Sequence, residues 1–490
     1  MAAVLPASAG AAPARFLVVV DPELEFSDLG ALSKQGAVGL LVPDAGPETS
    51  EARARAAVAS GKVRNSLLGD KPPGPALISL LDAAQTRPAL PVIAVGLPRG
   101  GTQPNDRRYP IFVQGPRHRG LLTSSSTRIP GLVSVVDVAP TALGREGKLG
   151  STQDDDPPGA LRELDRRIRE HRDAKTPFLL VSFALIVGLA LFRRAAVIPA
   201  FAAVLLANLC LGITGRTNVW VDLFVVLAFA GASIALARFR PVVHGVLLAG
   251  VLGAYLVAMW IDAAWVALSP LGPTQNARFY GLSNLLSTLL LVPAVASAAI
   301  LGGWAAAAVA ALALVTVGGS RFGADGGGVL VLLTGYAILF ALTQRPNRRT
   351  LLAAAAVLVA LVAALALGGG SHVTTAIAGG PAELAEDFWR RLHLSWLRAT
   401  SGWGVALLVF GGIAALVLLA LRERRRLLLA YLAALAVSLL VNDSPNDVIV
   451  AGLAGYLVLS TAPGVARRAA ERATPAAPEP RARSAPAATQ

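Results

Sequence analysis

Long apolar blocks separated by short polar segments fill the chain from residue 177 to residue 463. A helix needs about 20 mostly apolar residues to cross the hydrocarbon layer of a membrane. Backbone polar groups in that layer must be satisfied within the segment itself, which favours helices over strands. The pattern therefore predicts an α-helical polytopic membrane region with about 11 spans. The expected spans are 177–192, 195–214, 219–237, 242–266, 283–301, 303–318, 327–343, 350–367, 402–421, 426–441 and 447–462.

The chain before this region has a different pattern, in which short apolar runs alternate with helical and polar segments. Residues 51–60 predict a helix, because Thr49 and Ser50 precede it as caps and Gly61 ends it. Strands that alternate with helices predict an α/β domain with a parallel sheet. The expected strands are 16–20, 37–42, 91–95 and 111–113, and the run 133–138 fits either a fifth strand or the lead-in to a helix capped by Asp137.

These patterns divide the chain into five segments. The Ala/Pro-rich N-terminus has no basic region ahead of an apolar stretch, so it is interpreted as disordered or as the remnant of a signal peptide. The Ala/Pro/Arg-rich tail has no apolar periodicity, which is typical of disorder. The segments are the N-terminus at 1–14, the α/β domain at 15–155, a charged juxtamembrane helix at 156–176, the transmembrane domain at 177–463 and the tail at 464–490.

The juxtamembrane segment carries both charges and a narrow apolar stripe formed by Leu161, Leu164 and Ile168. Its acidic and basic residues have the spacing of ion pairs on one helix face. We therefore expect a charged helix that lies on lipid headgroups beside the first span. The expected pairs are Glu163 with Arg167, Asp165 with Arg169, and Arg169 with Asp173.

Composition supports the membrane interpretation, because 54% of the 490 residues are hydrophobic and only 15% are charged. The formal charge of +14 does not indicate nucleic-acid binding, since the basic residues of the second half form short clusters between apolar blocks. Such clusters set membrane orientation. With the α/β domain outside, the inner loops and tail receive 16 arginines and the outer loops 6. The sequence thus predicts a plasma-membrane protein with an extracytoplasmic α/β domain and a cytoplasmic C-terminus.

Three polar loops, at 273–284, 318–328 and 442–447, fall on the outer side in this topology. Charged residues beside apolar spans are costly and are usually functional or paired. Arginine presents a planar donor fork that suits phosphate or carboxylate groups, and a glycine-rich stretch lets the backbone approach a ligand closely. The substrate-binding candidates are Asn276, Arg278, Tyr280, Asn284, Arg321, Asp325, Asn442 and Asp443.

A structural alternative for these loops is that their charged residues pair among themselves. Arg278, Arg321, Asp325 and Asp443 would then form an ion-pair network that holds the outer loops together. The sequence leaves both alternatives open.

Three segments of the α/β domain resemble the alkaline phosphatase and sulfatase superfamily. VVVDPE at 18–23 is similar to its first strand with a metal-binding acid, and residues 46–61 to the segment that carries the nucleophile at a helix start. SSSTR followed by GLVSVVDVAPTAL, at 124–128 and 131–143, is similar to its closing segment. The resemblance implies part of an alkaline-phosphatase-like fold, with Asp21 as a metal ligand and Thr49 or Ser50 at the nucleophile position.

The superfamily uses two metal ions held by several Asp and His residues, and this chain departs from that pattern. Its α/β domain contains one histidine, His118, and no Asp-His pair. Asp21 alone cannot hold two ions that must act together. We therefore expect a degenerate domain in which Asp21 is a vestigial metal ligand. No cofactor is assigned to this domain, and it would not require a divalent metal.

The polar loops also resemble those of uncharacterised bacterial membrane proteins that join an alkaline-phosphatase-like domain to a multi-span region. This resemblance implies a bacterial envelope protein, with the lipid bilayer and an anionic or lipid-linked envelope substrate as partners. The alternatives are a transporter or flippase of an envelope precursor, a scaffold for envelope enzymes, and a phosphoesterase that keeps its metal-dependent activity.

Overall fold

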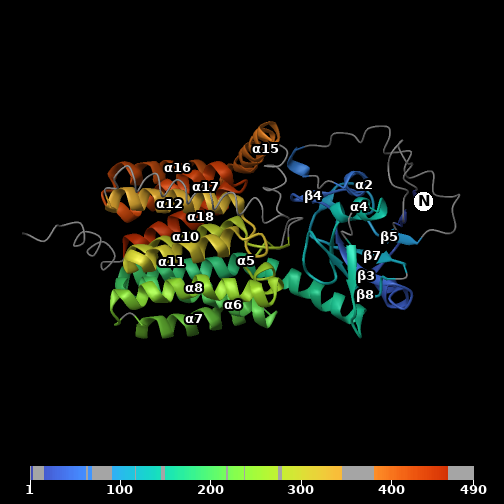
Figure 1. Ribbon diagram of the computed structural model, residues 1–490, viewed down its shortest axis with the longest axis horizontal. Coiled ribbons are helices and arrows are strands. Elements are labelled where there is room, and N and C mark those ends of the chain that lie inside the picture. Colours follow the sequence, from blue (N-terminus) through green and yellow to red (C-terminus); the bar gives the residue numbers. More distant parts are fainter. Residues whose placement is uncertain are drawn as a thin grey trace, which may run out of the picture.

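The computed structural model consists of an α/β part and a bundle of long helices, which lie end to end along the long axis of the molecule (Figure 1). We call the end of the bundle that faces the α/β part the proximal end, and the opposite end the distal end. The structure describes residues 2–3, 16–21, 23–61, 65–68, 91–115, 117–144, 149–216, 219–236, 238–273, 279–344 and 380–461. The expected span 350–367 and the tail at 464–490 lie outside the described residues.

The α/β part is built on one eight-stranded sheet with the order β1-β2-β5-β7-β3-β8-β10, in which β9 also pairs with β3. A short pair, β4 with β6, lies apart from it. The strands are β1 Ala2–Ala3, β2 Leu17–Val20, β3 Ala37–Val42, β4 Glu48–Thr49, β5 Val92–Val95, β6 Gln103–Pro104, β7 Tyr109–Val113, β8 Gly120–Ser124, β9 Leu132–Ser134 and β10 Leu149–Thr152. Ala2 and Ala3, expected to be disordered or part of a signal remnant, thus pair with β2.

The sheet is mixed, which corrects the expected parallel sheet. Strand β7 runs antiparallel to both of its neighbours, β5 and β3, whereas β2–β5, β3–β8 and β3–β9 are parallel. The link from β5 to β7 contains no described helix, and antiparallel neighbours need no helical crossover. The run 133–138 combines the two expected alternatives, because β9 ends at Ser134 and a 3-10 turn at 135–137 leads into α4 (Val138–Ala142).

Helices cover both faces of the sheet and give the α/β part three layers. Helix α2 (Glu51–Ser60) packs with α4 on one face. Of the predicted caps of α2, Ser50 and Gly61 are confirmed, since the Ser50 hydroxyl accepts from the backbone N–H of Arg53 and Gly61 has a φ of 62°, whereas Thr49 lies in β4 and does not cap the helix. The other face is covered by α1 (Leu29–Leu32) and by the first turns of α5 (Pro157–Phe192).

Helix α5 joins the two parts as one continuous helix of 36 residues. The juxtamembrane helix and the first span are therefore a single element, with Pro177 inside it. The predicted position of its apolar stripe on lipid headgroups is wrong. Leu161, Leu164 and Ile168 are buried against the sheet and against Ala264 to Leu268 of the bundle, because that contact removes the stripe from water completely.

Nine further long helices of the described residues form the bundle together with the second half of α5 (Figure 1). Six helices of the described chain, α5 among them, are long and apolar enough to cross a membrane. Helices α11, α17 and α18 are shorter, with 16 residues each, and α17 is about 24 Å long. The remaining helices are α6 Val197–Thr214, α7 Val219–Leu236, α8 Pro241–Ile261, α10 Asn284–Leu301, α11 Gly303–Gly318, α12 Gly326–Gln344, α16 Trp403–Arg422, α17 Arg426–Val441 and α18 Pro445–Ser460, with the short α9 Ala263–Ala267 and the amphipathic α15 Pro381–Ala399 at the proximal end.

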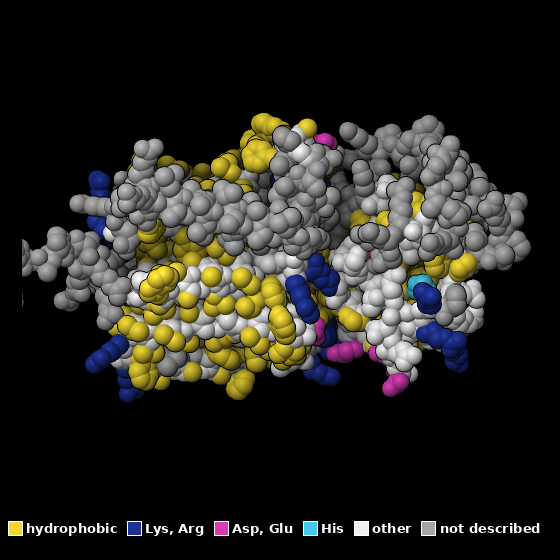
Figure 2. Space-filling model, in the orientation of Figure 1, with side chains coloured by type: hydrophobic (Ala, Val, Ile, Leu, Met, Phe, Trp, Pro, Cys, Tyr) yellow, Lys and Arg dark blue, Asp and Glu magenta, His cyan; other side chains and the backbone are white. Residues whose placement is uncertain are grey.

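The surface of the bundle is as apolar as its interior. Each exposed large hydrophobic side chain of the described residues lies between Leu180 and Leu440, and hydrophobic side chains cover the visible flank of the bundle (Figure 2). Such a continuous apolar surface is not found on soluble proteins of this size. These helices therefore belong in a membrane. Basic side chains gather at the distal end and where the two parts meet (Figure 2).

A buried polar network lies inside the bundle near its proximal end. Asn208 donates to Tyr255 Oη at 2.9 Å and to Ser269 Oγ at 3.1 Å, and its Oδ1 accepts from the Leu271 N–H at 2.9 Å. Tyr255 in turn donates to the Leu205 carbonyl at 2.8 Å. Because these buried groups satisfy one another, the network stabilises helix packing.

Candidate functional site

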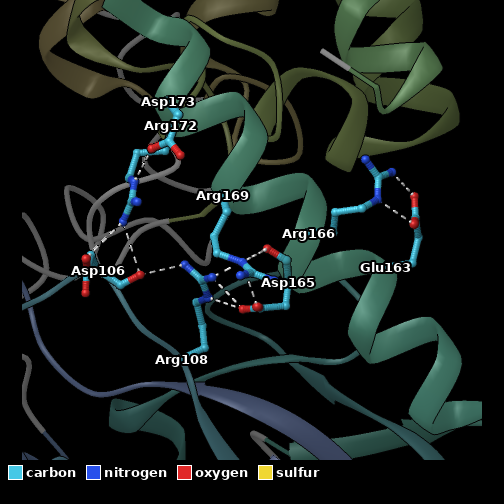
Figure 3. Close-up of polar contacts among 8 residues, drawn as sticks. All are labelled: Asp106, Arg108, Glu163, Asp165, Arg166, Arg169, Arg172 and Asp173. Atoms are coloured by element: carbon cyan, nitrogen blue, oxygen red, sulfur yellow. Dashed lines mark hydrogen bonds and ion pairs between the residues drawn. The ribbon is translucent and has the colours of Figure 1, made fainter. Parts of the chain in front are cut away.

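The α/β part is fixed to helix α5 by a partly buried group of charges (Figure 3). Arg108 is only 6% exposed, and its Nε and Nη2 contact Asp165 Oδ1 at 2.8 and 2.5 Å. Arg169 approaches the second oxygen of Asp165 at 3.0 Å, and Arg172 approaches Asp106 at 3.5 Å. These ion pairs connect the loop before β7 to the first half of α5.

Only one of the three predicted ion pairs on α5 forms, that of Asp165 with Arg169. Glu163 pairs with Arg166 instead of Arg167, and this hydrogen bond is the main reason why the pKa of Glu163 lies below its usual value. Arg167 donates to the Gly212 carbonyl at 3.0 Å. Its guanidinium therefore holds the proximal end of α6 against α5.

The same stretch of α5 contains a fully buried histidine, His171. Neither ring nitrogen has a hydrogen-bond partner among the described residues. Burial, together with the positive charges of Arg167 and Arg166, lowers the pKa of His171 to about 3. The side chain is therefore neutral at physiological pH.

Two of the three predicted polar loops meet directly at the proximal end of the bundle. Asn284, at the start of α10, donates from Nδ2 to Asp443 Oδ1 at 2.9 Å, although the two residues are 159 positions apart. Arg398, from the last turn of α15, contacts Asp443 Oδ2 at 3.0 Å and donates to Ser444 Oγ at 2.8 Å. Asp443 is thus fully paired, with a cation that the sequence analysis did not single out.

The third loop brings Asp325 beside the other two. Asp325 is 6% exposed, and its Oδ1 accepts from the Gly328 N–H at 2.9 Å as α12 begins. A Cβ on Gly328 would lie 2.6 Å from Asp325 Oδ2 and 2.7 Å from Ser287 Oγ, and one on Gly327 would lie 3.3 Å from Asn442 Oδ1. The absence of side chains at these glycines therefore lets Asp325, Ser287 and Asn442 pack closely against the start of α12.

Asp325 Oδ2 is buried and has no hydrogen-bond partner among the described residues. Ala324, just before it, adopts a left-handed backbone with a φ of 49°, which costs about 1 kcal/mol for a residue with a Cβ. A buried carboxylate oxygen without a donor is also unfavourable. A hydrogen-bond donor brought to this oxygen would therefore stabilise the junction.

Tyr280 and Arg321 lie on the side of these loops that meets the α/β part. Tyr280 is buried, and the guanidinium of Arg128 stacks 4.4 Å above its ring. Arg128 also donates to the Ser320 carbonyl at 2.6 Å. Arg321 is exposed and lies 5.1 Å above the ring of Trp260. Asn276 and Arg278 lie outside the described residues.

The segment SSSTR, which the sequence analysis noted for its resemblance, positions Arg128. Asp137 is buried and accepts hydrogen bonds from the hydroxyls of Ser124 and Ser126, the latter at 2.7 Å. These bonds close the turn after β8, and Arg128 leaves that turn with a φ of 59°. The two motif segments thus direct one arginine of the α/β part into the loops of the bundle.

The carboxyl edge of the sheet holds the candidate residues of the α/β part. Asp21 Oδ1 accepts from the Glu23 N–H at 2.9 Å, which closes a turn after β2. Thr49 Oγ1 is buried without a partner among the described residues, and Asp44 is buried 3.5 Å from Arg53 Nε. No group of three potential metal ligands occurs within the part of the chain that the structure describes.

No known family model, curated protein or solved structure matches this chain.

Proposed function

We propose that this chain is a multi-pass protein of a bacterial plasma membrane that binds an anionic or lipid-linked envelope molecule at the junction of its two parts. The α/β part would lie outside the cell and the C-terminus inside. The membrane region would have about eleven spans. Ten of these correspond in position to described helices, and local thinning of the bilayer with flanking polar residues that reach the interface would accommodate the short ones.

The distribution of arginines along the bundle supports this orientation. Successive helices alternate in direction, so the clusters at 193–194, 238–240 and 422–426 share the distal end. Loops rich in arginine stay in the cytoplasm. The proximal end, with the α/β part, then faces outward.

The Oδ2 of Asp325, buried and without a partner among the residues that the structure describes, is the observation that carries the binding proposal. A sugar hydroxyl or an amine of the bound molecule would donate to it. Arg321 lies in the same loop and exposes its guanidinium, which suits a phosphate or carboxylate group. The two side chains together favour a ligand that combines a donor with a negative charge.

The α/β part is proposed to be a degenerate relative of the alkaline phosphatase superfamily that covers the site. Asp21 closes a turn, Ser50 caps α2, and Arg53 supplies the positive charge beside Asp44. Each of these residues therefore has a structural task that needs no metal ion. The close contacts of Arg128 with the bundle favour a cover that is held in place.

Purification of the full chain in mild detergent, followed by native mass spectrometry of what remains bound, tests this proposal. We expect a bound anionic molecule on the wild type and its loss from Asp325→Ala and Arg321→Ala. Arg55→Ala, at a partly exposed position of α2 away from the junction contacts described above, is the matched control and should keep the ligand. A ligand that survives both site substitutions would contradict the proposal and favour the scaffold alternative.

Membrane orientation is tested separately by labelling introduced cysteines in intact cells after the native Cys210 is replaced by alanine. A cysteine in the exposed turn at Gly101 should react with an impermeant reagent, and one at Arg424 should not. The reverse result would place the site on the cytoplasmic side.

A further inference from the structure

An apolar slot lies in the bundle beside the polar loops, between helices α15, α16 and α17. Its volume is about 850 Å³. The polar groups of its lining, His393 and Ser395, lie on α15. The rest of the wall is mostly aliphatic and aromatic, with Trp389 and Trp396 of α15 and Phe410 of α16 among the lining residues.

The slot is long and narrow. Along α16 its lining extends from Val409 to Ala420, a distance of about 17 Å at the rise of an α-helix. Carbon atoms in contact lie about 4 Å apart, so an extended hydrocarbon chain is much thinner than the slot. The slot therefore has room for lipid tails along its length.

The polar end of the slot is continuous with the candidate site. Pro445, which lines the slot, follows Asp443 and Ser444, and both of these residues bind Arg398 of α15. The second half of α15 also carries Arg390 and Arg391. A molecule whose tail enters the slot would thus hold its headgroup among basic side chains at the proximal end.

We propose that this slot binds the hydrocarbon tail of a membrane lipid with an anionic headgroup, and that it is the tail subsite of the junction site. The identity of the natural ligand rests on the proposed function, whereas the binding of a hydrocarbon tail is argued from the dimensions and lining of the slot itself. Trp389 and Trp396 are 65% and 59% exposed, and tryptophan at such positions marks the level of the headgroups.

Photolabelling of the full chain in phosphatidylcholine vesicles tests the tail subsite. The probes are phosphatidylglycerol and phosphatidylcholine, each with a diazirine near the end of one tail, and labelled peptides are mapped by mass spectrometry. We expect the phosphatidylglycerol probe to label the α16 and α17 walls of the slot about tenfold more than the exposed face of α11.

Two substitutions fill the slot without disturbing the packed core. Ala436 and Ala420 line it and are exposed, so a phenylalanine at either position extends into the free space. Ala436→Phe and Ala420→Phe should each lower slot labelling about tenfold. Ala307→Phe, on an exposed position of α11, is the matched control and should leave it unchanged. Unaltered thermal unfolding of the three variants verifies that they fold.

The headgroup preference is tested by replacing Arg390 and Arg391 together with glutamine. The preference for phosphatidylglycerol over phosphatidylcholine should fall about fivefold or more, because each basic residue at a membrane surface attracts anionic lipid. Equal labelling of slot and α11 face would overturn the tail proposal. So would slot labelling that survives both fillings, or crosslinks showing that the slot is occupied by this chain or a second copy.

Failure of this proposal and failure of the proposed function give different results. Loss of the natural ligand from Asp325→Ala with unchanged slot labelling supports a separate tail subsite. Loss of slot labelling in Ala436→Phe with the natural ligand still bound would overturn the link between slot and site while leaving the proposed function intact.

Discussion

Replacing Arg108 by methionine should loosen the α/β part from helix α5. Methionine keeps most of the aliphatic length of arginine but removes the charge and the two short contacts to Asp165 Oδ1. Removing one partner of a buried ion pair costs about 3–5 kcal/mol. Asp165 is 22% exposed and keeps Arg169 at 3.0 Å, so we expect a smaller loss of about 2 kcal/mol.

Thermal unfolding of the full chain in detergent, followed by differential scanning fluorimetry, measures this loss. For a domain of the size of the α/β part, a loss of about 2 kcal/mol in the free energy of unfolding lowers Tm by about 4–8 °C. Limited proteolysis should cut the link between the α/β part and the bundle faster in the variant, because local opening becomes easier.

A double-mutant cycle with Asp165→Asn separates the pair from other effects of the arginine. The two substitutions together should cost much less than the sum of the single ones, because each removes the same interaction. Arg55→Met is the matched control, since Arg55 forms a partly exposed i,i+4 pair with Glu51 on α2, and such helix pairs are worth about 0.3–0.5 kcal/mol. Equal losses for Arg108→Met and Arg55→Met would refute the reasoning.

Three further predictions concern the junction and the bundle. Arg128→Ala should lower the stability of the contact between the two parts by about 1–2 kcal/mol, because the cation–π contact with Tyr280 and a hydrogen bond are lost, and faster proteolysis of the α/β part would report it. The free energy of unfolding should fall by about 2 kcal/mol when the pH falls from 7 to 5. The pKa of His171 in the folded chain lies below its ordinary 6.5, so the unfolded chain binds the proton at a higher pH than the folded chain. His171→Gln should therefore show a smaller change in Tm over this pH range. Gly212→Ala should unfold at a lower temperature than the wild type, because its Cβ would lie 1.9 Å from a backbone carbonyl oxygen of α9. Gly188→Ala, with open space around the new Cβ, is the control and should have an unchanged or slightly higher Tm.

Hydrophobic patterning located most of the secondary structure correctly. The expected spans 303–318 and 426–441 coincide with α11 and α17, and 51–60 coincides with α2 and its caps. These elements are determined locally, since a long apolar run or a cap acts through neighbouring residues. The antiparallel position of β7 was not predicted, because strand direction depends on which distant strand pairs with it.

The candidate site shows the same division. Alternation of the spans was enough to expect the loops at 284 and 443 on one side, and the Asn284–Asp443 bond joins them. Pattern alone did not identify Arg398, which was counted only among the six arginines of the outer loops, or Arg128, which belonged to a motif of the α/β part. Both act by reaching across to residues far away in the sequence.

The sequence by itself determined that this chain has an α/β part and a set of apolar helices, because the solvent preference of each segment is encoded in its own residues. Only the tertiary structure decided which charges are paired. It neutralised Asp443 with Arg398 and left one oxygen of Asp325 buried without a partner among the described residues. Pairing depends on approach within hydrogen-bond distance, which the packing of whole helices sets.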